Sequence, residues 1–234
     1  MRSLTILWLA FVAPLVVFAS FDGADWDAYR LKNPEKSFQP FTTDRLTAKP
    51  ATAENFEALF EAGKTVFSQP QVLEYWAGSR TDTPETTERW RVFLGRAQKR
   101  CEANLLSWRG CYLTAEPETF VGFVGAHRYQ DAGNPYDGTV EAAVVFDSNH
   151  WKKGYAMESL QGFAKNDLMR LENYQYIFIP THAANENSLK LGQKFGTKPW
   201  ILDLTDPLVP SHLKRENRTF WRVEKEAIVK TFGN

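Results

Sequence analysis

The 234-residue chain is poor in cysteine and has no excess of charge of either sign. Its two cysteines are too few for a disulfide scaffold or for a zinc site of four thiolates. The 28 Lys and Arg residues balance 28 Asp and Glu residues, so the chain lacks the basic excess with which a general nucleic-acid binder neutralises phosphates. It also contains neither a GxxxxGK phosphate loop nor a GxGxxG dinucleotide motif. We therefore expect no nucleic-acid partner.

Apolar residues, by contrast, are abundant. Hydrophobic residues make up 43% of the chain and aromatic residues 14%, enough for the closed core of one ordinary domain. Strands and helices alternate in the second half, which predicts an α/β fold with mixed strand directions. The apolar spacing predicts strands at 41–50, 108–114, 120–129, 139–146, 174–179 and 219–227, and helices at 52–67, 84–104, 154–171 and 187–195, the first two helices with Thr52 and Thr83 as N-caps.

The first residues form a short apolar leader. Residues 4–19 carry no charge, and the run is shorter than the roughly 20 residues that span a bilayer. Val17 and Ala19 lie at the −3 and −1 positions of a secretory signal cleaved after Ala19. We expect residues 1–19 to act as a signal peptide or membrane anchor, followed by a linker at 20–40. The protein is then secreted or membrane-anchored, or cytoplasmic if the leader is not functional.

The segment 151–156 has the features of an anion-binding turn. It follows the expected strand at 139–146 and leads into a helix, whose first N–H groups and positive dipole end attract anions. Gly154 permits close approach of the backbone, and Lys152 and Lys153 add positive charge. This pattern suits a pyrophosphate group, although the same kind of turn occurs in α/β proteins that bind no ligand there.

A second polar segment follows the expected strand at 174–179. Asn185 and Ser188 lie three residues apart where this strand leads into a helix. Such residues cap helices, and that is one interpretation. If the strands at 139–146 and 174–179 form a parallel pair, however, both polar segments lie at the carboxyl ends of the strands, where α/β proteins bind ligands.

Three segments together resemble a known family. TTDRLTAKP (42–50), EAAVVFDSNHWKKGYAMESL (141–160) and NENSLKLGQKFG (185–196) are similar, in order and spacing, to motifs of the ribosomal-protein (Rim-type) branch of the GNAT acetyltransferases. The resemblance implies an α/β GNAT fold, with a mixed, mostly antiparallel central sheet and helices on both faces. It further implies that this fold forms a single domain over residues 41–234.

The resemblance also implies an activity. Enzymes of this family are N-acetyltransferases that use acetyl-CoA as a co-substrate and a primary amine as the acceptor. We expect direct transfer in a ternary complex, with either a protein N-terminus or a small amine as acceptor. The alternative is an exported or membrane-anchored binding protein that retains the GNAT fold without turnover, because acetyl-CoA is not expected outside the cytoplasm.

By resemblance, the turn at 151–156 offers backbone amides to the pyrophosphate of acetyl-CoA. Lys152 replaces a common glycine, and its side chain is expected to point outward, towards the 3′-phosphate. Asn185 corresponds to the residue that hydrogen-bonds the pantetheine arm, and Ser188 to a residue near the thioester. The full set of expected cofactor contacts is Val144, Val145, Phe146, Trp151, Lys152, Lys153, Gly154, Tyr155, Ala156, Asn185 and Ser188.

Acetyl transfer requires a base, because only a neutral amine attacks the thioester carbonyl. Glu141 is the first candidate and His182 the second, since histidine titrates near neutrality. Glu141 is alternatively a surface charge on an edge strand, and His182 a structural residue. The oxyanion is expected to accept from a backbone N–H within 144–146, and Ser188 or Tyr155 to protonate the leaving thiolate.

The remaining candidates are aromatic residues and cysteines. Tyr75, Trp76 and Trp90 either wall the acceptor pocket or belong to the core. Cys101 and Cys111 pair if the compartment is oxidising and stay thiols in the cytosol. The histidines lack partners at metal-ligand spacing, so no metal is expected.

Overall fold

The computed structural model describes residues 39–75, 83–103, 105–128, 140–171, 174, 176–195, 198–200 and 218–232. The expected leader at 1–19, nearly all of the expected linker at 20–40, and Trp76 lie outside these residues. Among the described helices, none has the length and apolar character needed to cross a membrane.

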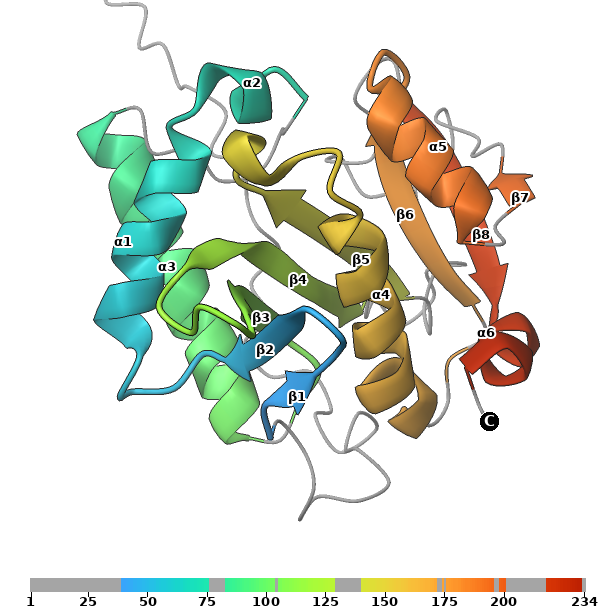
Figure 1. Ribbon diagram of the computed structural model, residues 1–234, viewed down its shortest axis with the longest axis horizontal. Coiled ribbons are helices and arrows are strands. Elements are labelled where there is room, and N and C mark those ends of the chain that lie inside the picture. Colours follow the sequence, from blue (N-terminus) through green and yellow to red (C-terminus); the bar gives the residue numbers. More distant parts are fainter. Residues whose placement is uncertain are drawn as a thin grey trace, which may run out of the picture.

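One mixed sheet organises the chain (Figure 1). Its eight strands follow the order β1-β2-β3-β4-β5-β6-β8-β7. Every neighbouring pair is antiparallel except β5 and β6, which run parallel. The mixed, mostly antiparallel sheet expected from the sequence is therefore confirmed. The strands are β1 (Phe41–Thr42), β2 (Leu46–Pro50), β3 (Trp108–Leu113), β4 (Phe120–Arg128), β5 (Val140–Phe146), β6 (Tyr176–His182), β7 (Lys198–Trp200) and β8 (Arg218–Glu224).

Helices cover both faces of the sheet (Figure 1). α1 and α3 pack against each other on one face, and α4 crosses the other face beside β2, β4 and β5. Short 3-10 turns at Ser148–His150 and Leu168–Arg170 flank α4. The helices are α1 (Phe56–Phe67), α2 (Pro70–Leu73), α3 (Pro84–Glu102), α4 (Tyr155–Asn166), α5 (Glu186–Lys194) and α6 (Lys225–Phe232).

Two apolar cores lie on the two faces of the sheet. Under α1 and α3, the rings of Phe67, Trp90 and Phe123 contact one another at centroid distances of 4.8 to 6.0 Å. Trp90 is 1% exposed, and its indole N–H donates to the carbonyl of Phe60 at 3.1 Å. Trp90 is thus a core residue, and the alternative that it walls an acceptor pocket is wrong. The second core, under α4, contains Leu160 and Phe163.

Several element boundaries differ from the sequence prediction. Thr83 caps α3 as expected, and Thr86 completes a capping box with it. Thr52 was expected to cap α1, but the N-cap is Asn55. The Asn55 side chain accepts a hydrogen bond from the N–H of Thr52, so Thr52 belongs to the turn before the helix. The expected last strand ends at Glu224, and the following residues begin α6.

α4 ends earlier than the apolar spacing predicts. The helix was expected to continue to about residue 171, but it stops at Asn166. Asp167 follows and is fully buried, and its carboxylate accepts two hydrogen bonds of 2.6 Å from Arg109 on β3. A contact between residues so far apart in sequence leaves no trace in local spacing.

Candidate active site

The central feature of the candidate site is the divergence of β5 and β6. The two strands pair in parallel only at Val140 with Ile177 and at Glu141 with Phe178. β5 continues to Phe146 and β6 to His182, and beyond Glu141 no described strand pairs with β5 on that side. The parallel pair on which the ligand-binding interpretation depended is present, and its open carboxyl end leaves what we call the unpaired edge of β5, residues 142–146.

The register of β4 and β5 shows which backbone groups face this edge. The N–H of Asp147 donates to the carbonyl of Val121 at 3.0 Å. Antiparallel ladders alternate, so Val145 also directs its N–H towards β4, whereas Val144 and Phe146 direct theirs away from β4. Val144 and Phe146 therefore offer backbone groups at the unpaired edge. Val145 does not, and its side chain lies in the core under α1 and α3.

The turn between β5 and α4 has an unusual backbone. Trp151 anchors its start by donating from its indole N–H to the carbonyl of Phe146 at 2.7 Å. Lys152 has a φ of 62° and Gly154 a φ of 85°. The left-handed region costs a residue with a Cβ about 1–2 kcal/mol, whereas glycine enters it freely. Strain held at one residue, with fixed contacts around it, is typical of ligand-binding turns.

The start of α4 presents backbone donors, as expected from the sequence. The first intrahelical hydrogen bond runs from the N–H of Glu158 to the carbonyl of Gly154 at 3.1 Å. The N–H groups of Tyr155, Ala156 and Met157 precede it and have no acceptor within the helix. Lys152 and Lys153 are exposed beside them. The arrangement is suited to an anion.

The strain at Lys152 leads to a stability prediction. Replacing Lys152 with glycine should raise the free energy of unfolding by about 0.5–1 kcal/mol, because the relieved strain exceeds the added entropy of the unfolded chain. Lys152→Ala is the matched control, since alanine keeps the Cβ and the strain. Urea denaturation measures both, and a Lys152→Gly variant less stable than Lys152→Ala would show that Lys152 is not strained.

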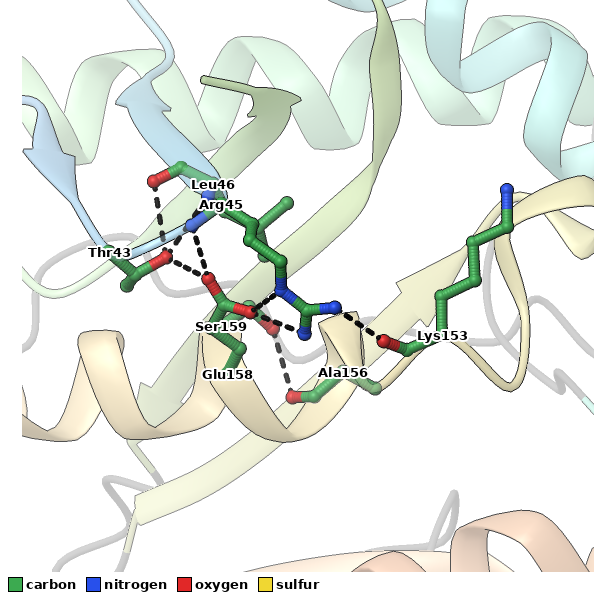
Figure 2. A network of polar contacts seen from close by, with 7 residues as sticks. All are labelled: Thr43, Arg45, Leu46, Lys153, Ala156, Glu158 and Ser159. Atoms are coloured by element: carbon green, nitrogen blue, oxygen red, sulfur yellow. Dashed lines mark hydrogen bonds and ion pairs between the residues drawn. The ribbon is translucent and has the colours of Figure 1, made fainter. Parts of the chain in front are cut away.

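A network that we did not predict from the sequence braces this turn (Figure 2). Arg45, between β1 and β2, donates from Nε to Glu158 Oε2 at 2.7 Å and from Nη1 to the carbonyl of Lys153 at 2.9 Å. The Thr43 hydroxyl also donates to Glu158 Oε1. Burial opposes ionisation of Glu158, but the hydrogen bonds from Thr43 and Arg45 outweigh it and lower its pKa. Glu158 is therefore an anion at neutral pH.

The second polar segment begins α5 and caps it. Asn185 is the N-cap, and its Oδ1 accepts from the N–H of Ser188 at 3.1 Å. The capping interpretation is therefore correct. Capping uses only the Oδ1 atom of Asn185, and its Nδ2 group is a separate donor that can bind a ligand. Ser188 lies half-buried in the first turn of α5, which packs against β6 and β8.

His182 ends β6 and contacts Tyr75, in the segment that follows α2. Its Nδ1 accepts from the N–H of Ala184 at 3.2 Å, so in the neutral ring the proton lies on Nε2, which is then a donor. Its ring lies 5.5 Å from that of Tyr75. Tyr75 thus joins the segment after α2 to the end of β6. In the neutral ring, this hydrogen bond occupies the lone pair of Nδ1.

Glu141 lies where β5 and β6 stop pairing. It is 9% exposed and belongs to an interior strand, so the alternative of a surface charge on an edge strand is wrong. Side chains alternate along a strand, and Val145 faces the core under α1 and α3. Glu141 faces the same side, next to Ala143. Glu141 therefore lies at the apex of the divergence, with its side chain on the α1 and α3 side of the sheet.

The described residues offer no other reactive centre. Within those ranges, no group of three or more His, Cys, Asp or Glu side chains is arranged to hold a metal ion. Cys101 and Cys111 are both buried free thiols. Burial raises the pKa of Cys111 to about 12 and also raises that of Cys101, so neither forms a reactive thiolate near neutral pH.

A mixed sheet with one diverging parallel pair, next to a helix start that presents backbone N–H groups, is typical of N-acetyltransferase folds. The sequence profile of the acetyltransferase (GNAT) domain matches residues 45–198, which is more than half of the chain. The protein belongs to this family, and its enzyme class is N-acetyltransferase. Acetyltransferases of the family use acetyl-CoA. Among curated proteins, none matches the sequence significantly.

Solved structures share the fold at low sequence identity. A GNAT-family acetyltransferase from Bacillus anthracis is 20% identical, with a TM-score of 0.55, and the match covers 80% of this chain and 99% of that one. A GCN5-related N-acetyltransferase from Brucella melitensis is 16% identical, with a TM-score of 0.58 and 84% of each chain covered. RimL, a ribosomal L7/L12 alpha-N-protein acetyltransferase in complex with coenzyme A, is 10% identical, with a TM-score of 0.58 and coverage of 81% and 99%.

Proposed function

We propose that the protein transfers the acetyl group of acetyl-CoA directly to a primary amine in a ternary complex. One observation carries the proposal: the unpaired edge of β5 runs from Glu141 to the anion-binding turn at the start of α4. A ligand that combines an amide-bearing arm with a diphosphate matches this sequence of groups. Acetyl-CoA is such a ligand.

The polar groups suit the successive parts of acetyl-CoA. The N–H groups at 154–156 would hold the diphosphate, with Lys152 and Lys153 adding charge. The amides of the pantetheine arm would pair with the unpaired edge of β5 as a further strand does. The Nδ2 of Asn185 would donate to the arm from the β6 side.

The chemistry follows from the same placement. Glu141 would accept a proton from the acceptor ammonium, directly or through water, and the neutral amine nitrogen would then attack the thioester carbonyl carbon. The N–H of Val144 would donate to the oxyanion of the tetrahedral intermediate. Collapse breaks the carbon–sulfur bond, and the thiolate takes a proton from Ser188 or Tyr155. The second proton that the nitrogen loses as the amide forms restores the proton of that hydroxyl. The hydrogen bond from Ala184 to His182 favours Glu141 over His182 as the base.

For the acceptor, we propose a protein N-terminus, in line with the Rim-type branch. The likeness to RimL, which acts on the alpha-amino group of a ribosomal protein, supports this choice only at the level of the fold. A small amine is the second candidate. The segment 76–82, which follows Tyr75 and precedes α3, lies outside the described residues.

Calorimetric titration of the full chain with acetyl-CoA tests the proposal. We expect saturable binding with one site, followed by thiol release when a panel of peptides with free N-termini or small amines is added. An absence of binding at high micromolar acetyl-CoA would overturn the enzyme assignment. Binding without thiol release by any amine would instead support the non-catalytic alternative.

A further inference from the structure

We infer that Arg45 is a positioning residue for the diphosphate site, acting through the backbone of the turn before α4. The inference rests on the proposed function, because it concerns how the turn meets a diphosphate. Arg45 itself is not placed in contact with the ligand. Its role is to hold one peptide plane in a fixed orientation.

The contacts of Arg45 fix its guanidinium in three directions (Figure 2). Nε and Nη2 meet Glu158 Oε2 at 2.7 and 2.6 Å, and Nη1 meets the carbonyl oxygen of Lys153 at 2.9 Å. The backbone N–H of Arg45 donates to the other Glu158 oxygen at 2.8 Å. The guanidinium carbon lies 4.8 Å from the centre of the Tyr155 ring. Only a planar fork of donors can make these contacts together.

The contact with Lys153 determines where the next N–H points. In a trans peptide, the C=O of one residue and the N–H of the following residue point in opposite directions. Because the carbonyl of Lys153 is turned towards Arg45, the N–H of Gly154 must point away from Arg45. Gly154 is one of the two left-handed residues in the turn, and a glycine can adopt several backbone conformations. Through its hydrogen bond to the Lys153 carbonyl, Arg45 holds the peptide between Lys153 and Gly154 in one orientation.

Attraction between charges does not explain the arrangement. The Arg45 charge is neutralised by Glu158, whose side chain is 15% exposed and whose pKa is lowered by its partners. Glu158 also places a negative charge in the first turn of α4, near the diphosphate site. By charge alone, Glu158 weakens anion binding. Its presence beside the proposed anion site is explained if it anchors Arg45.

This difference in sign gives a sharp test. Glu158→Gln removes a negative charge from the site, so simple electrostatics predicts tighter binding of coenzyme A. Loss of the Arg45 anchor predicts the opposite. We expect Glu158→Gln and Arg45→Lys to weaken coenzyme A binding by about tenfold, the effect of misdirecting one charge-assisted hydrogen bond. Titration calorimetry of the full chain measures both affinities.

A second ligand distinguishes the contribution of the turn backbone to binding from that of the lysine side chains. Dephospho-coenzyme A keeps the diphosphate but lacks the 3′-phosphate. Arg45→Lys should weaken both ligands by the same factor, whereas Lys152→Ala should weaken coenzyme A by a larger factor than dephospho-coenzyme A. Arg89→Lys is the matched control, because Arg89 is an exposed arginine that pairs with Glu85 within α3. It should bind both ligands as the unmodified protein does.

The outcomes distinguish the inference from the function on which it rests. If the unmodified protein binds neither ligand, the proposed function and the inference both fail. If it binds and Glu158→Gln binds as tightly or more tightly, the inference alone is overturned. Thermal unfolding without ligand shows whether a variant is folded. If Arg45→Lys is not folded, Glu158→Gln, which keeps the side-chain shape, decides.

Discussion

Asp167→Asn should lower the free energy of unfolding by about 3–5 kcal/mol, the cost of leaving a buried charge without its partner. Asp167 and Arg109 are 0% and 1% exposed, and two hydrogen bonds of 2.6 Å join them. Asparagine has nearly the same shape, so the change creates no cavity. It leaves the Arg109 guanidinium buried and facing an amide group that offers only one acceptor oxygen. Urea denaturation of the full chain measures the loss.

The double variant Arg109→Met with Asp167→Val should recover much of this loss. Two apolar side chains of similar size need no desolvated charges, and exchanges of this kind are often close to neutral. Recovery will be incomplete, because Arg109 also donates to the carbonyl of Gln39 at 2.9 Å. A double variant less stable than Asp167→Asn would show that the two side chains do not act as a pair.

Glu61→Gln is the control for the same change from carboxylate to amide. Glu61 pairs with Lys64 within α1, and both side chains are exposed to solvent. Exposed pairs of this kind contribute about 0–1 kcal/mol, so little change is expected. If Asp167→Asn costs no more than Glu61→Gln, the pair between β3 and the end of α4 is not buried in solution.

The ends of the helices show how far local sequence carries a prediction. Thr83 and Gly154 mark helix starts correctly, because capping depends on groups within a few residues. The prediction that Thr52 is the N-cap of α1 is wrong, because Asn55, three residues later, begins the helix and bonds to the N–H of Thr52. The end of α4 fails for a different reason. Asp167, the residue that follows the helix, pairs with an arginine on a distant strand, and no spacing within residues 154–171 contains that information.

The candidate site shows the same division. The turn that leads from β5 into α4 and the cap of α5 could be predicted, since each is a local pattern at the end of a strand. The bracing of that turn could not, because Arg45 and Glu158 lie 113 residues apart. Both residues lie within the segments that carry the family resemblance. A search for opposite charges between those segments would have predicted the contact. Which of Val144, Val145 and Phe146 faces the unpaired edge depends on strand register.

Glu141→Gln should lower turnover with an amine acceptor by about 10²-fold or more, the contribution of a positioned general base. Affinity for coenzyme A should stay within about twofold, because Glu141 lies at the apex of the divergence, away from the turn at 151–156. Thiol-release kinetics and calorimetry measure the two quantities separately. Glu118→Gln is the control, since Glu118 is exposed between β3 and β4.

His182→Gln tests the competing base. The Nδ1 of His182 is committed to the N–H of Ala184, so we expect a smaller loss of turnover than for Glu141→Gln. A larger loss would assign the base to His182. Unchanged turnover in both variants would mean that bulk water removes the proton.

The pH dependence separates a base from a residue that only shapes the site. An alpha-amino acceptor has a pKa of about 8, so near pH 6.5 it is mostly an ammonium ion and its proton must be removed at the enzyme. Near pH 9 the amine is already neutral, and a base contributes less. The gap between the unmodified protein and Glu141→Gln should therefore be widest at low pH and narrow as the pH rises. A purely structural Glu141 would produce a gap that does not change with pH, because distorting the unpaired edge of β5 would slow the reaction of neutral and protonated amines alike.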